Sequence, residues 1–165
     1  MTTLNYLNTD SGISTTMADY VNAEHIRAFI NAGDVEILDS TVSTAAERHL
    51  EQSFPLRSYA TIIDWDKIPS AMLEWNTVSD EEALNWAMTT TIGENTFGLL
   101  LYDPYQPCLI GPLDFMLRHL DELVWKAPGC RFLFGVERDE VGRIIFGNGI
   151  VEFNGKGELF ATADA

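Results

Sequence analysis

Residues 131–163 place the strongest constraint on the fold, because short apolar segments alternate there with turn signals. The segments are RFLFGVE, GRIIFG, GIVEF and GELFATA, and the sequences between them are RDEVG, GNG and NGKG. Asn-Gly is a favoured hairpin turn, and strands that follow one another so closely pair antiparallel. This part of the chain is therefore predicted to form an antiparallel meander, with GNG as one of its turns.

Helical and strand patterns alternate in the preceding part of the chain. Ser79 and Glu82 match a capping box, which marks the clearest helix start in the sequence. Pro69 suits the first turn of another helix, in which Ile68, Met72 and Trp75 share one face and place Trp75 in the core. Helices are predicted over 18–32, 43–54, 68–75, 80–91 and 113–126, and strands over 34–38, 58–65 and 96–103.

These elements predict an α/β (α+β) fold with flanking helices, a mixed, mainly antiparallel sheet and the C-terminal meander. Residues 1–16 are rich in Thr, Ser and Asn and are expected to form an irregular arm. Residues 17–165 are expected to form a single globular domain, since 165 residues with 46% hydrophobic content suit one core.

The net charge of −15 limits the kinds of molecule that the protein is expected to bind. It argues against direct binding of nucleic acid and against docking on anionic membranes, because both need Lys and Arg, and it favours a basic protein. The sequence shows no signal peptide and no run of 18 apolar residues. Cys108 and Cys130 are expected to be reduced thiols, so the expected location is cytoplasmic.

The negative charge is concentrated in the middle of the chain. Residues 58–117 hold nine acids and one base, Lys67, which gives −8. Residues 1–57 hold eight acids and three bases, for −5, and residues 118–165 hold eight acids and six bases, for −2. Carboxylates without basic neighbours leave a negative field in the middle segment.

Motifs for catalysis are weak in this sequence. No GxSxG or Cys/His ligand cluster is present, and His25, His49 and His119 lie on separate predicted helices. Glu122 stands three residues after His119 and is expected to be its neighbour. We therefore expect no catalytic residue, cofactor or metal. One alternative stays open, a small enzyme with a carboxylate or metal site at Asp64 and Asp66, which would share one face of the predicted strand.

Trp86 is the most unusual surface candidate. On a wheel of 100° per residue, Leu84, Ala87 and Met88 form the buried stripe of the helix. Trp86 falls opposite that stripe, beside Glu82, and Trp is enriched at the centres of protein interfaces. The alternative is that a neighbouring element covers this face and buries the helix on both sides.

The candidate partner-binding surface combines carboxylates of the acidic segment with exposed aromatic rings. YDPYQP follows a predicted strand and supplies a loop tyrosine. The nine candidates are Asp64, Asp66, Asp80, Glu81, Glu82, Trp86, Glu94, Asp103 and Tyr105.

In size, acidity and lack of catalytic motifs, the chain resembles immunity proteins of bacterial polymorphic toxin and contact-dependent growth inhibition systems. The resemblance implies an inhibitor, or antitoxin, that neutralises the basic C-terminal domain of a cognate toxin, often a nuclease, by occluding its active or substrate-binding site. Besides the small enzyme, a regulatory adaptor that mimics nucleic acid stays open, since it would have the same acidity.

Overall fold

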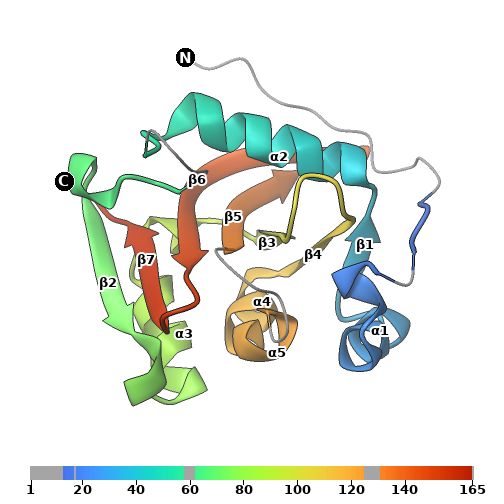
Figure 1. Ribbon diagram of the computed structural model, residues 1–165, viewed down its shortest axis with the longest axis horizontal. Helices are drawn as coiled ribbons and strands as arrows, with labels where there is room; N and C mark the ends of the chain where they lie inside the picture. The colour runs from blue at the N-terminus through green and yellow to red at the C-terminus, as the bar shows by residue number, and fades with distance from the viewer. Residues whose placement is uncertain (1–12, 17, 58–61, 125–130, 165) are drawn as a thin grey trace.

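The computed structural model describes residues 13–16, 18–57, 62–124 and 131–164. Within these residues, seven strands form one antiparallel sheet in the order β1-β4-β3-β5-β6-β7-β2 (Figure 1). This confirms the predicted α+β class with a mainly antiparallel sheet. The strands are β1 Glu36–Leu38, β2 Ser70–Glu74, β3 Phe97–Leu101, β4 Cys108–Pro112, β5 Arg131–Arg138, β6 Ile144–Phe153 and β7 Glu158–Thr162.

Helices cover both faces of the sheet. The α-helices are α1 Glu24–Asn31, α2 Ser40–Ser53, α3 Asp80–Met88, α4 Leu113–Arg118 and α5 Leu120–Val124, and the 3₁₀ turns are η1 Tyr20–Asn22, η2 Trp65–Lys67, η3 Trp75–Thr77 and η4 Thr91–Glu94. In Figure 1, α2 lies across one face and the other α-helices lie against the opposite face. None of the described helices has the length and apolar character that a bilayer crossing requires.

The central strands β3 and β5 are buried almost throughout because both of their faces are covered. Leu99 and Leu101 of β3 join the core cluster beneath α2, whereas Leu100 joins the cluster on the opposite face. The alternation of side chains along one strand therefore supplies two separate cores.

α2 is held on its face of the sheet by a narrow apolar stripe. Val42, Ala46 and Leu50 follow one another at four-residue spacing and are buried. Asp39 caps the helix by accepting a hydrogen bond from the amide of Thr41 at 2.7 Å. The helix thus starts a few residues earlier than predicted.

The predicted helix over 68–75 is wrong. Residues Ser70–Glu74 form β2, an edge strand that pairs with β7 and sets Met72 opposite Phe160. Pro69 immediately precedes β2, and a proline is equally compatible with the first residue of an edge strand. Trp75 still reaches the core as predicted, since its ring packs edge-on against Phe153 with centroids 4.5 Å apart.

Several other boundaries differ from the prediction. The helix expected over 18–32 is confined to α1, preceded by η1. The helix expected over 113–126 divides at His119 into α4 and α5. In the strand expected over 58–65, residues 58–61 lie outside the described part, and Ile63 forms only an isolated bridge with Leu56. β4 had no predicted counterpart, and residues 1–12 of the expected N-terminal arm also lie outside the described residues.

The predicted GNG turn is also wrong, because β6 continues through it as one strand. Phe134 of β5 faces Ile150, and Val136 faces Phe146. Between these pairs β5 contributes Gly135 alone, while β6 contributes all three residues of GNG, 147–149. The sequence that suggested a hairpin turn therefore forms a bulge inside a long strand.

The bulge depends on Gly149, which has a φ of 89°. A Cβ atom built there would lie 2.4 Å from the backbone nitrogen of Ile92 in η4. Both the left-handed backbone and this close approach require a residue without a side chain.

We expect Gly149→Ala to destabilise the protein by about 2 kcal/mol or more, because it combines backbone strain with a clash against backbone atoms. Urea denaturation followed by circular dichroism measures the change. Gly155→Ala is the matched control, since no atom lies within 4 Å of the position that its Cβ would take. If the two variants had equal free energies of unfolding, the close contact between η4 and the bulge would not contribute to stability, and the prediction would be wrong.

Candidate functional site

The nine predicted site residues do not share one surface. Trp65, which separates Asp64 from Asp66, belongs to the core cluster on the α2 side of the sheet. α3, which begins at Asp80, contributes Leu84 to the cluster on the opposite side. The acidic segment therefore wraps around the sheet and divides its carboxylates among separate surfaces.

Asp64 immediately precedes the 3₁₀ turn η2 and Asp66 lies within it, so neither lies on a strand. The prediction that strand alternation places both carboxylates on one face is therefore wrong. Asp64 Oδ2 lies 3.6 Å from Lys67 Nζ, whereas Asp66 is exposed. No group of three or more His, Cys, Asp or Glu side chains in the described part of the chain is arranged to hold a metal ion.

The acids at the start of α3 serve the helix and its neighbours. The predicted cap is confirmed, since Ser79 Oγ accepts a hydrogen bond from the amide of Glu82 at 3.1 Å. Glu81 lies 3.7 Å from the guanidinium of Arg118. Burial raises the pKa of Asp121, and the charge of Asp80 raises it further. This surface therefore contains a basic side chain among its acids.

The predicted outward orientation of Trp86 is wrong. Trp86 is partly buried and packs against the core cluster, while Met88, predicted to face inward, is 41% exposed. The physical reason is that the core extends around α3 beyond the predicted stripe, since α3 packs beside α4 and Trp86 packs against the core cluster. Trp86 therefore contributes to packing within the protein.

The loop of residues 102–107 is fixed at both ends. Tyr102 is buried and donates a hydrogen bond to the carbonyl of Leu123 at 2.7 Å. On the α2 side, Ser43 donates to the carbonyl of Gln106, and Thr44 donates to the carbonyl of Pro104 at 2.8 Å. These bonds hold the loop against α2.

Tyr105 projects from this fixed loop and is 85% exposed. Its amide donates to Asp103 Oδ1 at 2.7 Å, which closes a local turn. Both residues were predicted site residues, and the structure places them in one exposed turn beside α2.

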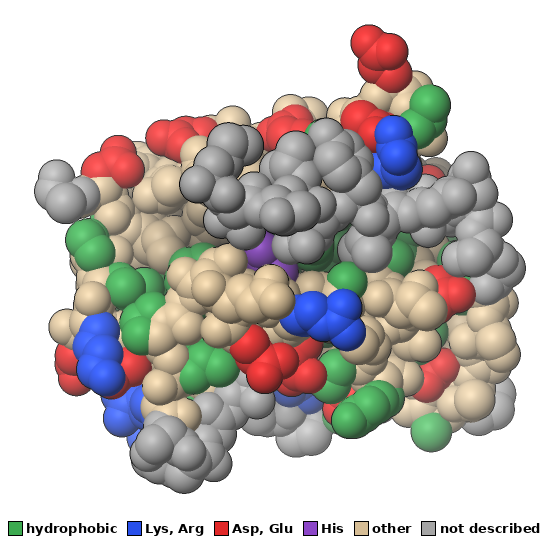
Figure 2. Space-filling view, turned by 90° about the horizontal axis from the view of Figure 1, so that it is seen from above, with side chains coloured by type: hydrophobic (Ala, Val, Ile, Leu, Met, Phe, Trp, Pro, Cys, Tyr) green, Lys and Arg blue, Asp and Glu red, His purple; other side chains and the backbone are tan. Residues whose placement is uncertain are grey.

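Two further acids, Glu47 and Glu51 of α2, belong to the same surface. Burial raises the pKa of Glu47, and the nearby charges of Glu51 and Asp103 raise it further. We call the set of Glu47, Glu51, Asp103 and Tyr105 the α2 surface. The four-residue spacing of Glu47 and Glu51 is visible in the sequence, but their proximity to Asp103 arises from the fold. Figure 2 shows that acidic side chains are spread over the molecule seen from above, where basic ones are few.

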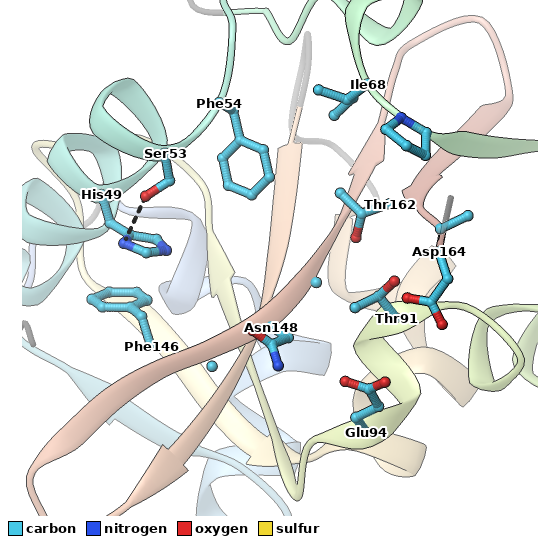
Figure 3. A pocket seen from close by; sticks show the side chains of 14 residues that line it. His49, Ser53, Phe54, Ile68, Thr91, Glu94, Phe146, Asn148, Thr162 and Asp164 are labelled. Atoms are coloured by element: carbon cyan, nitrogen blue, oxygen red, sulfur yellow. Dashed lines mark hydrogen bonds between the residues drawn. The ribbon is translucent and has the colours of Figure 1, made fainter. Parts of the chain in front are cut away.

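A cavity of about 780 Å³ opens at the other end of α2. Its walls come from five parts of the chain (Figure 3): the end of α2, the residues Ile68 and Pro69 before β2, η4, the bulge of β6 and the residues at the end of β7. The side chains shown include Glu94, the one predicted site residue in the cavity, together with Asp164.

The bulge of β6 and η4 are joined through Asn95. The side-chain amide of Asn95 donates to the carbonyl of Ile92 at 3.0 Å and also to the carbonyl of Asn148. η4 is thereby held against β6, with Thr91 and Glu94 at the cavity. Sequence reasoning missed this arrangement because it treated GNG as a turn.

His49 forms part of the opposite wall. Its ring stacks on Phe146 with centroids 4.4 Å apart, and Nδ1 lies 3.3 Å from Ser53 Oγ. Burial lowers the pKa of His49, which favours the neutral imidazole at pH 7. The histidine therefore adds an aromatic surface and little positive charge.

The remaining candidate groups are structural. Cys108 is buried in β4, and burial raises the pKa of its thiol to about 12, whereas Cys130 lies outside the described residues. His119 Nδ1 lies 3.0 Å from Glu122 Oε1, as the three-residue spacing predicted.

Comparisons with protein families, curated proteins and solved structures found no match for this chain.

Glu152 is a buried carboxylate beneath the DWD turn and is only 2% exposed. Its two oxygens accept hydrogen bonds from the amide of Ile63 at 3.3 Å and from Trp65 Nε1 at 3.2 Å. Burial raises its pKa, and these two hydrogen bonds and the charge of Arg57 only partly oppose that shift. The folded protein therefore binds a proton at Glu152 more tightly than the unfolded chain does.

Protonation of Glu152 thus stabilises the fold at low pH, and this contribution is lost as the pH rises through the folded-state pKa. We expect the unfolding free energy of the wild type, minus that of Glu152→Gln, to fall as the pH rises above the ordinary value of 4.5. Urea denaturation at several pH values measures the difference. Glu140→Gln, at an exposed turn position, is the control. A difference for Glu152→Gln that stays flat or rises would contradict the pKa direction.

Proposed function

We propose that this protein is an acidic inhibitor that binds a basic protein partner, in the manner of an immunity protein that neutralises the basic C-terminal domain of a toxin. The α2 surface would contact the partner and cover its active or substrate-binding site. The observation that supports this proposal is the clustering of three carboxylates, Glu47, Glu51 and Asp103, beside a tyrosine that is 85% exposed.

The electrostatics of the α2 surface favour a cationic partner. The carboxylates of Glu47, Glu51 and Asp103 are close enough to repel one another in the free protein, which contributes to the raised pKa of Glu47. Lys and Arg side chains of a partner would relieve that repulsion, and the negative field would accelerate the encounter. A toxin that binds nucleic acid presents such side chains at its substrate-binding surface.

The fixed loop favours tight binding. Side chains of α2 hold the loop through its backbone, so Tyr105 is presented without ordering of the loop on binding. Tyrosine is also enriched among the residues that dominate binding energy at interfaces. Asp103 and Tyr105 thus keep their predicted roles, and Glu47 and Glu51 join them in place of Trp86.

The proposal is tested by co-expressing the chain with the product of the gene immediately upstream of its own. We expect a stable complex and protection of the host from that product. Glu51→Lys with Tyr105→Ala should weaken binding about 100-fold or more, because it reverses a charge and removes the exposed ring. Affinity and the salt dependence of the association rate are measured by surface plasmon resonance.

Asp66→Lys with Met72→Ala is the matched control. It reverses an exposed acid and truncates a side chain that is 47% exposed, but on η2 and β2. The control should bind within about threefold of the wild type. Equal losses in both double variants, or no complex, would overturn the proposal. Comparable binding to several unrelated nucleic-acid-binding proteins would instead support the nucleic-acid mimic.

A further inference from the structure

The cavity at the end of α2 has two chemically different walls. One is aromatic, formed by Phe54 and by the ring of Phe146 stacked on His49. The other is acidic and hydroxylic, formed by Glu94, Asp164 and Thr91 (Figure 3). A volume of about 780 Å³ falls in the range that holds small organic molecules.

The carboxylates of the acidic wall, Glu94 and Asp164, are available to pair with a positive charge. Within the described part of the chain, neither Glu94 nor Asp164 forms an ion pair. Among the described residues that line the cavity there is no Lys or Arg. His49 is kept neutral at pH 7 by the burial that lowers its pKa. The cavity therefore combines a negative potential with aromatic surface.

The walls are also held in place before any ligand enters. Gly149 allows the backbone of β6 to touch that of Ile92, and the amide of Asn95 joins η4 to the bulge. The hydroxyl of Thr162 accepts a hydrogen bond from the amide of Ile150 at 3.1 Å, which ties the end of β7 to β6. A binding site whose walls are preformed loses less free energy to ordering.

We propose that this cavity binds a small organic cation, with an ammonium or guanidinium group on an aromatic body. The charged group would lie between Glu94 and Asp164, with the hydroxyl of Thr91 as a further acceptor. The body would lie against Phe54 and the Phe146–His49 stack, where aromatic contact and cation–π attraction add to the charge interaction. Anionic ligands are disfavoured by the same two carboxylates.

This inference does not rest on the proposed toxin inhibition. The α2 surface consists of Glu47, Glu51, Asp103 and Tyr105, none of which lines the cavity. The variant Glu51→Lys with Tyr105→Ala should therefore keep its affinity for a small cation even where it loses a protein partner. The two proposals can fail separately.

The test uses 2-phenylethylamine as the probe and 2-phenylethanol as its neutral counterpart. Titration calorimetry should give a Kd on the order of 1 mM or tighter for the amine and about tenfold weaker binding of the alcohol. In ¹H–¹⁵N spectra, the amine should shift the amide signals of Gly147, Asn148 and Thr162. Absence of binding at about ten times that concentration, or equal binding of amine and alcohol, would overturn the proposal.

The double variant Glu94→Gln with Asp164→Asn removes both charges. The replacement side chains have nearly the same shape and both positions are exposed, so the fold should be retained. This variant should weaken amine binding about tenfold and leave the alcohol unaffected. Asp66→Asn with Glu140→Gln is the control, since it changes the net charge equally at exposed positions outside the cavity. Wild-type affinity in the first variant, or the same loss in the control, would overturn the assignment of the acidic wall.

Discussion

Burial of both faces of β3 and β5 is the constraint on which the remaining structure depends. These strands direct apolar side chains to both sides of the sheet, so each face requires its own cover. α2 covers one face, and α1, α3, α4 and α5 cover the other. The position of α2 in turn brings Glu47 and Glu51 to the loop that carries Asp103. It also places His49 above Phe146 at the cavity.

Local sequence signals predicted the elements whose chemistry is local. The Ser79 cap, the turn at Asn154–Gly157 and the apolar strand at 97–101 were all readable, because neighbouring residues determine them. The segment Ser70–Glu74 was not, since its pairing partner β7 lies more than eighty residues away. The prediction of a turn at GNG was wrong because residues distant in the sequence decide the structure there too. η4 and Asn95 stabilise a bulge where the local sequence favours a turn.

In the candidate sites, too, features set by neighbouring residues were predicted and features set by distant residues were not. Exposure of Tyr105 followed from its place in a Pro-containing loop, but the partial burial of Trp86 depends on packing against the rest of the core, which a helical wheel of α3 does not contain. Glu47 and Glu51 of α2 lie in residues 1–57, which carry less net negative charge than residues 58–117. A prediction based on the distribution of charge along the sequence therefore did not include them. The cavity draws on five separate segments, and only the fold brings Glu94 to Asp164.

The way in which α2 holds the loop of residues 102–107 has a consequence for evolution. Ser43 and Thr44 bond to the carbonyls of Gln106 and Pro104, and a carbonyl is present whatever side chain the loop carries. The side chain at position 105 points to solvent and contributes nothing to the core. Mutation at this tip can therefore accumulate without a stability penalty, and the proposed contact with a partner could diverge while the scaffold stays constant.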